Sequence, residues 1–125
     1  MTEAVSIASR SEEETISCGG RLAGRLRGGE LVSLAGDLGS PSFSLVQRYE
    51  GRLTLVHVDL YRLGSADELR EESIDELRRP DSVVAVEWAE RLGASIAADA
   101  IRVLIRDEGD DRRSIQIDWP EVLEN

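Results

Sequence analysis

The chain has 125 residues, which suits one domain with a real hydrophobic core and leaves no room for a second. Its formal net charge of −10 argues against a broad electrostatic surface for RNA or DNA, and its 41% hydrophobic content is ordinary for a globular protein. All 15 of its Lys and Arg residues are arginine, so the chain contains no lysine.

The first predicted element is an N-terminal helix. Ser11 followed three residues later by Glu14 forms a capping box that opens it, and Gly28-Gly29 end it. Its apolar face is expected to hold Ile16, Leu22, Ala23 and Leu26. A short and nearly all-apolar strand follows over Leu31–Ala35, as in a sheet that is buried on both faces.

The middle of the chain predicts a hairpin, a helix and another strand. Two β-like runs, Phe43–Tyr49 and Leu53–Leu60, are separated by a short turn. A second capping box at Ser65–Glu68 opens a helix that is expected to reach about Leu77. The core candidates on this helix are Leu69, Ile74 and Leu77. Ser82–Val86 is the next strand, and its composition predicts burial.

The C-terminal part predicts a closing hairpin of Ile101–Arg106 and Arg112–Asp118, joined by an acidic, solvated loop over Asp107–Asp111. Apolar residues alternate along it at Ile101, Val103, Ile105, Ile115 and Ile117. Buried strands mixed with helices indicate an α/β domain.

The single cysteine, Cys18, excludes an internal disulfide and a metal site built from several cysteines. No apolar run approaches the ~20 residues that span a bilayer, and the N-terminal stretch lacks the basic start of a signal peptide. We therefore expect a cytoplasmic protein with no membrane segment.

Two acidic residues follow apolar strands, where ligand sites form in open α/β sheets. Asp59 ends the run that begins at Leu53, and Glu87 follows Val83–Val86. Carboxylates there can hold Mg²⁺ or orient a water for attack on a γ-phosphate, although acids are also common wherever strands reach the surface. Trp88 either walls a pocket or fills the core, and His57 is more simply a packed strand residue than a metal ligand.

Four blocks of this chain, in order, resemble the signature blocks of the TsaE family. They are Gly36–Gly39, Ser40–Val46, His57–Leu63 and Val86–Trp88, and the resemblance covers nearly the whole chain. The third block followed by the fourth is the most distinctive part. TsaE proteins are bacterial P-loop ATPases that assist the synthesis of threonylcarbamoyladenosine in tRNA, together with TsaD and TsaB.

The resemblance implies a single TsaE-like domain over residues 1–125, with a P-loop-NTPase-like mixed sheet flanked by helices. It implies Mg²⁺ binding by Asp59 and Glu87, with Glu87 also catalytic. The residues that match nucleotide binding are Gly36, Asp37, Leu38, Gly39 and Trp88. Those that match a switch-like segment near the phosphates are Ser40, Pro41 and Ser42. The cofactors implied are ATP and Mg²⁺, and the partners are TsaD and TsaB, with tRNA contacted only indirectly.

The chain departs from the family pattern after Gly39. Family members continue through Ala-Gly-Lys-Thr-Thr into a helix, whereas Gly39 here directly precedes Ser40. The P-loop lysine, the Mg²⁺-binding threonine and the P-loop helix are therefore lacking, and arginine cannot copy a lysine cradled inside that loop. We expect ATP binding to be impaired or absent, which leaves open whether the chain is an enzyme. It is alternatively a non-catalytic partner-binding remnant, or the internally deleted product of a normal TsaE gene.

The same junction constrains the sheet. A parallel crossover needs a dozen or more residues, and seven residues separate Ala35 from Phe43. The strand that begins at Phe43 must therefore turn back antiparallel or lie apart from the strand at Leu31–Ala35.

Overall fold

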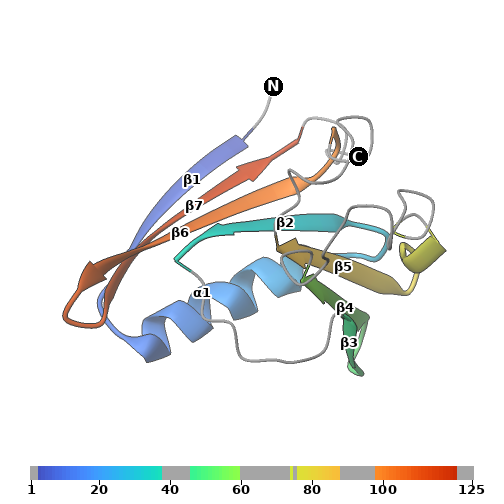
Figure 1. The fold of residues 1–125 in the computed structure, drawn as a ribbon, viewed down its shortest axis with the longest axis horizontal. Coiled ribbons are helices and arrows are strands. Elements are labelled where there is room, and N and C mark those ends of the chain that lie inside the picture. The colour runs from blue at the N-terminus through green and yellow to red at the C-terminus, as the bar shows by residue number, and fades with distance from the viewer. Residues whose placement is uncertain (1–2, 38–45, 60–73, 75, 88–97, 121–125) are drawn as a thin grey trace.

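The computed structural model describes residues 3–37, 46–59, 74, 76–87 and 98–120. Its elements are β1 (Glu3–Ser9), α1 (Glu12–Arg25), β2 (Leu31–Gly36), β3 (Val46–Tyr49), β4 (Thr54–Asp59), β5 (Ser82–Glu87), β6 (Ile101–Gly109) and β7 (Arg112–Trp119). The strands form one mixed seven-stranded sheet in the order β1-β7-β6-β2-β5-β4-β3, with α1 along one face (Figure 1). Within the described part of the chain, no helix is long and apolar enough to cross a membrane.

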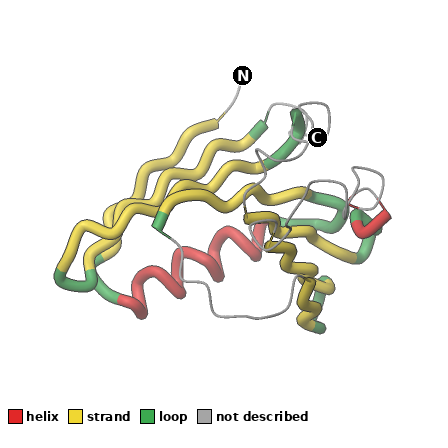
Figure 2. The backbone as a smooth tube through the Cα atoms, viewed as in Figure 1, coloured by secondary structure: helices red, strands yellow, loops and turns green. Residues whose placement is uncertain are grey.

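The centre of the sheet is parallel, and antiparallel strands lie outside it. Strands β6, β2, β5 and β4 run in the same direction, while β7 and β3 run against their neighbours. The predicted mixed α/β sheet is confirmed, and Figure 2 shows how far strands outweigh helix among the described residues.

The predicted Ser11 N-cap of α1 is confirmed, but the return bond of a capping box differs, because the Glu14 side chain bonds the residue before the cap. The Glu14 N–H donates to the Ser11 hydroxyl at 3.1 Å, and a Glu14 carboxylate oxygen accepts from the Arg10 N–H at 2.7 Å. The predicted buried face is wrong at Ile16, which is 66% exposed, and at Ala23, which is also exposed, whereas Cys18 and Leu26 are buried. At about 100° per residue, Ile16 lies on the far side of the helix from Cys18, so burying one turns the other to solvent.

Strand β1 was not predicted from the sequence. It pairs antiparallel with β7 over its full length, from Glu3 opposite Trp119 to Ser9 opposite Arg113. Val5 and Ile7 alternate along it with small residues, which is the signal that could have identified it.

Both predicted hairpins exist with adjusted bounds. Strands β3 and β4 pair antiparallel, and Phe43–Leu45 lie outside the described residues. The acidic segment predicted over Asp107–Asp111 is exposed as expected, but the bounds of its turn are wrong because β6 continues to Gly109. The turn is shortened to Asp110-Asp111, whose positive φ angles of 54° and 63° are those of a two-residue hairpin turn.

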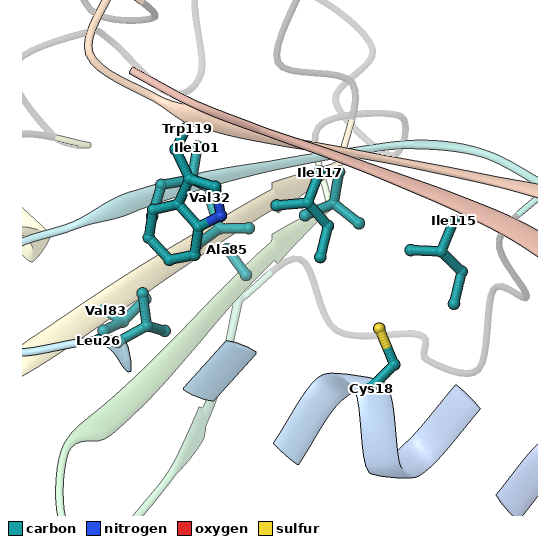
Figure 3. Close-up of a cluster of buried hydrophobic side chains, with 10 residues drawn as sticks. Cys18, Leu26, Val32, Val83, Ala85, Ile101, Ile115, Ile117 and Trp119 are labelled. Carbon is teal, nitrogen blue, oxygen red and sulfur yellow. The ribbon is translucent and has the colours of Figure 1, made fainter. Parts of the chain in front are cut away.

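The side chains form two hydrophobic layers, one on each face of the sheet. The layer on the face opposite α1 contains Ile74, which is fully buried, and Leu77 packs against it, as predicted. Leu69 and the capping box at Ser65–Glu68 lie outside the described residues. The layer under α1 is drawn in Figure 3 and contains Cys18, Leu26, Val32, Val83, Ala85, Ile101, Val103, Ile115, Ile117 and Trp119.

The topological prediction for the junction after β2 is confirmed. Strand β3 lies three positions away from β2 and runs in the opposite direction. Nine residues, 37–45, connect these strands. Fully extended they reach about 30 Å, which is ample for three strand spacings of about 4.8 Å.

Candidate functional site

The two predicted acidic residues are neighbours at the carboxyl edge of the parallel strands. Asp59 is opposite Glu87 in the β4–β5 register, and Glu87 is opposite Leu34 in the β2–β5 register. Asp59 is 5% exposed and Glu87 is 7% exposed. The sheet thus brings two buried carboxylates together beside the end of β2, where an open α/β sheet forms its ligand site.

His57 adds a contact that was not predicted. Its Nε2 atom lies 2.8 Å from a carboxylate oxygen of Glu87, and both side chains are largely buried. Residues two apart on a strand share a face, so His57 and Asp59 lie on the same face of the sheet. His57 is opposite Ala85, which belongs to the layer under α1, so this is the face that α1 covers. The Glu87 carboxylate is therefore already engaged by a neighbour from β4.

The start of the predicted phosphate loop is attached to β6. Gly36 has a φ of 101°, and a Cβ atom at this position would overlap the carbonyl group of Ile105. The Asp37 N–H donates to the Ile105 carbonyl at 2.8 Å, and a carboxylate oxygen of Asp37 accepts from the Asp107 N–H at 2.9 Å. Asp37 therefore directs its N–H and its carboxylate at β6.

The other predicted site residues lie outside the described part of the chain. They are Leu38, Gly39, Ser40, Pro41, Ser42 and Trp88. Their assignment to nucleotide binding or to a switch-like segment stays a prediction.

The described residues do not by themselves fit a metal centre. Among them, no group of three or more His, Cys, Asp and Glu side chains could hold a metal ion. Oxygen-ligated Mg²⁺ retains several waters and often takes one or two protein carboxylates, so Asp59 and Glu87 would need phosphate oxygens or a further side chain. Their assignment to Mg²⁺ likewise stays a prediction.

The opposite edge of the parallel strands holds a polar network that was not predicted. The buried Glu30 carboxylate accepts from the Arg27 N–H at 2.8 Å and from the Gly28 N–H at 2.7 Å. Arg78 donates two hydrogen bonds to the carboxylate of Asp99, at 3.1 and 2.7 Å. The Arg78 guanidinium lowers the pKa of Asp99 below its ordinary value of 3.8. These contacts fix the loops that enter β2, β5 and β6.

A mixed sheet with paired acids at the carboxyl ends of its parallel strands defines an α/β protein whose ligand site would lie at that edge. The profile of one family, described as threonylcarbamoyl adenosine biosynthesis protein TsaE, matches residues 38–115. The chain belongs to the TsaE family, whose role is in tRNA threonylcarbamoyladenosine biosynthesis.

Three relatives illustrate the match, each named tRNA threonylcarbamoyladenosine biosynthesis protein TsaE. The Rickettsia bellii protein is 30% identical, with 86% of this chain and 90% of the relative covered. The Bacillus subtilis protein is 29% identical, with 82% and 78% covered. The Treponema pallidum protein is 32% identical, with 65% of this chain covered, and the match spans 60% of that relative's length.

A crystal structure of Bacillus subtilis YdiB has the same fold. The two structures agree with a TM-score of 0.69 over 95% of this chain and 87% of that one. The sequence identity is 23%, so this likeness supports the fold alone.

Proposed function

We propose that this chain serves tRNA threonylcarbamoyladenosine biosynthesis in the cytoplasm as a partner of TsaD and TsaB, without the ATP binding and hydrolysis typical of its family. The observation that carries the proposal is the attachment of Gly36 and Asp37 to β6. The Asp37 N–H continues the β2–β6 ladder by donating to the Ile105 carbonyl, so it is directed at β6. The chain also has no lysine to supply the phosphate-binding ammonium group.

The lengths of the alignments support the loss of a segment. The alignment with the Bacillus subtilis relative spans 125 positions but takes in 82% of this 125-residue chain, so about a fifth of the positions have no residue here. The alignment with the Treponema pallidum relative is shorter, at 81 positions, and takes in 65% of the chain. Every one of its positions is therefore matched by a residue of this chain, so the unmatched positions belong to the longer alignment. The family profile begins its match at residue 38, directly after Asp37.

In this proposal, Asp59 and Glu87 retain the positions of the Mg²⁺ and hydrolysis residues but have lost the phosphate groups that would complete their site. Glu87 keeps a contact to His57 in the folded chain. Two buried acids without a phosphate cradle hold neither a nucleotide nor a metal ion well.

Calorimetric titration with Mg·ATP tests the loss of nucleotide binding. We expect no saturable heat from this chain. A restored variant, in which the P-loop segment and following helix of the Bacillus subtilis relative are inserted between Gly39 and Ser40, should bind in the micromolar range. The matched control is the restored variant with its inserted lysine changed to alanine. Micromolar binding by the unmodified chain would overturn the proposal.

Association with partners is tested separately. We expect the unmodified chain to co-purify with a TsaD–TsaB pair, because the match to the family profile, residues 38–115, lies wholly beyond residue 37. The Bacillus subtilis relative serves as the positive control. If the relative binds and this chain does not, the partner role is wrong.

A second candidate is that the chain is the internally deleted product of an ordinary TsaE gene, which the alignment shortfall also favours. Resequencing the coding region distinguishes the two. Recovery of a Gly-Lys-Thr segment between Gly39 and Ser40 would show that the active ATPase is the natural product.

A further inference from the structure

Strand β1 forms an edge of the sheet that no described strand pairs with on its outer side. Exposed edges in soluble proteins are usually protected by lysine, proline, bulges or short length, because their free N–H and C=O groups can pair with another chain. The seven residues of β1, Glu-Ala-Val-Ser-Ile-Ala-Ser, contain no proline and no lysine. The one charged residue, Glu3, turns toward Arg25 of the same chain at 3.2 Å.

We propose that β1 pairs antiparallel with β1 of a second copy of this chain, forming a continuous sheet across a two-fold axis. A two-fold axis between two antiparallel edge strands of one sheet stands perpendicular to the sheet. It therefore makes one residue of the strand lie opposite the same residue of the partner subunit. Ser6 is the middle residue of β1, so an axis there lets all seven residues pair. This proposal is independent of any role in tRNA modification.

The resulting register is self-complementary on both faces of the sheet. On the face that α1 covers, Val5 lies opposite Ile7 of the partner subunit, a pairing of branched apolar side chains. Both are half-buried and border a groove of about 320 Å³ between β1, β7 and α1. On the other face, Ala4 lies opposite Ala8 of the partner subunit, and small exposed side chains leave the approach unobstructed.

Helix α1 provides charge complementarity in this arrangement. It runs antiparallel to β1, because Glu3 contacts Arg25 near the end of the helix and Ser9 contacts Thr15 near its start, at 2.7 Å between the two hydroxyl oxygens. The first turn of α1 is acidic and its last turn carries Arg25.

An axis at Ser6 places Ser9 opposite Glu3 of the partner subunit. It therefore brings the acidic start of one α1 to the level of Arg25 of the partner subunit. Glu14, Arg21 and Arg25 follow a spacing of seven and four residues, so they share one side of the helix. Arg21 and Arg25 line the groove beside β1, so this shared side is the one nearest the edge. Glu14 of one copy then lies near the level of Arg25 of the partner subunit, which also keeps its pairing with Glu3 of its own chain, and this placement of opposite charges favours the antiparallel over the parallel association.

Sedimentation equilibrium of the unmodified chain tests the assembly. The monomer mass is 13.8 kDa, and we expect a reversible species of twice that mass. Ser6→Lys should weaken the dimer at least tenfold, because it puts two ammonium groups opposite each other at the axis. The matched control is Gln116→Lys, which makes the same charge change at the register partner of Ser6, one strand further in. A monomer up to millimolar concentration, or equal effects of the two variants, would overturn the proposal.

Disulfide trapping tests the register and does not depend on how well the lysine variants fold. In a Cys18→Ala background, Ser6→Cys should form a covalent dimer on mild oxidation. Ala8→Cys should not do so alone, because its expected neighbour is Ala4 of the partner subunit. A mixture of Ala4→Cys and Ala8→Cys chains should form the cross-link. If Ala8→Cys cross-links alone as readily as Ser6→Cys, the proposed register is wrong.

Discussion

His57 and Glu87 join two neighbouring parallel strands through a contact of 2.8 Å between the imidazole Nε2 atom and a carboxylate oxygen. His57 belongs to the sequence block His57–Leu63 and Glu87 to the block Val86–Trp88, the two most distinctive blocks of the TsaE resemblance. They are far apart in the sequence but meet in the β4–β5 register, where Asp59 lies beside Glu87. These two retained blocks of the family pattern therefore contact each other in the folded chain.

We predict that His57→Ala lowers the free energy of unfolding by about 1–3 kcal/mol, the range for leaving a buried polar group without its partner. The reason is that the Glu87 carboxylate, which is 7% exposed, would lose its contact and have little access to water. Urea denaturation followed by circular dichroism measures the change.

The matched control is His57→Gln, whose side-chain amide can donate a hydrogen bond from a similar position. It should lose less stability than His57→Ala. Equal losses in the two variants would show that Glu87 does not depend on a donor at position 57.

Much of the fold could be predicted because short apolar runs identify the central strands, although only β5 is buried along its whole length, whereas Ala35 of β2 and Leu55 of β4 are exposed. The apolar runs of β2, β4 and β5 were found within one or two residues of their ends. Strand β1 was missed because it is an edge strand of small residues, and its pairing with β7 joins segments more than 100 residues apart. The Asp110-Asp111 turn was missed because consecutive acids indicate a solvated loop equally well.

The site could be predicted in part. Asp59 and Glu87 were found because the ends of parallel strands meet at one edge of a sheet. The contacts from His57 to Glu87 and from Asp37 to Asp107 depend on register and side-chain direction, which spacing along a single chain does not determine. Ile16 was misplaced for a related reason, because the sheet, and not the helix alone, selects the buried face of α1.

Gly36→Ala should be strongly destabilising, by about 2 kcal/mol or more, because the new methyl group would overlap the carbonyl of Ile105 while the backbone holds a positive φ. Strand β2 would have to separate from β6 at this point, so the hydrogen bond from Asp37 to Ile105 should also weaken. Hydrogen exchange at the Asp37 amide, together with thermal melting, measures both effects.

The control for this change is Gly20→Ala. Gly20 lies inside α1, and a Cβ atom there would have no neighbour within 4 Å. The same substitution should therefore stabilise the chain by about 0.5–1 kcal/mol through helix propensity. If both variants shift the melting temperature in the same direction, the close approach of Gly36 to β6 is not important for stability.

Asp99→Asn should lower the free energy of unfolding at neutral pH by about 1 kcal/mol, a modest value because the Asp99 side chain is 35% exposed and solvent screens the pair. The Arg78 guanidinium lowers the pKa of Asp99 in the folded chain below its ordinary value of 3.8. A lowered folded-state pKa stabilises the fold above the unfolded-state pKa, and this contribution is lost as the pH falls through the folded value.

The difference in stability between the unmodified chain and Asp99→Asn should therefore be constant from neutral pH down to about 4 and shrink at lower pH. Urea denaturation at a series of pH values measures it. A difference that grows on acidification would show that the Arg78–Asp99 pair does not hold the carboxylate in its charged form.

Glu30→Ala should lower the free energy of unfolding by about 1–3 kcal/mol, because two backbone N–H groups, those of Arg27 and Gly28, would lose a charged acceptor in a partly buried loop. This loop cannot easily rearrange, since Gly28 has a φ of 119° and its backbone lies against the carbonyl of Pro80. Glu12→Ala, in the exposed first turn of α1, is the control and should change stability by about 0.5 kcal/mol or less. Denaturant unfolding compares the two variants. A loss for Glu30→Ala no larger than that for Glu12→Ala would mean that the loop between α1 and β2 keeps its conformation without the buried carboxylate.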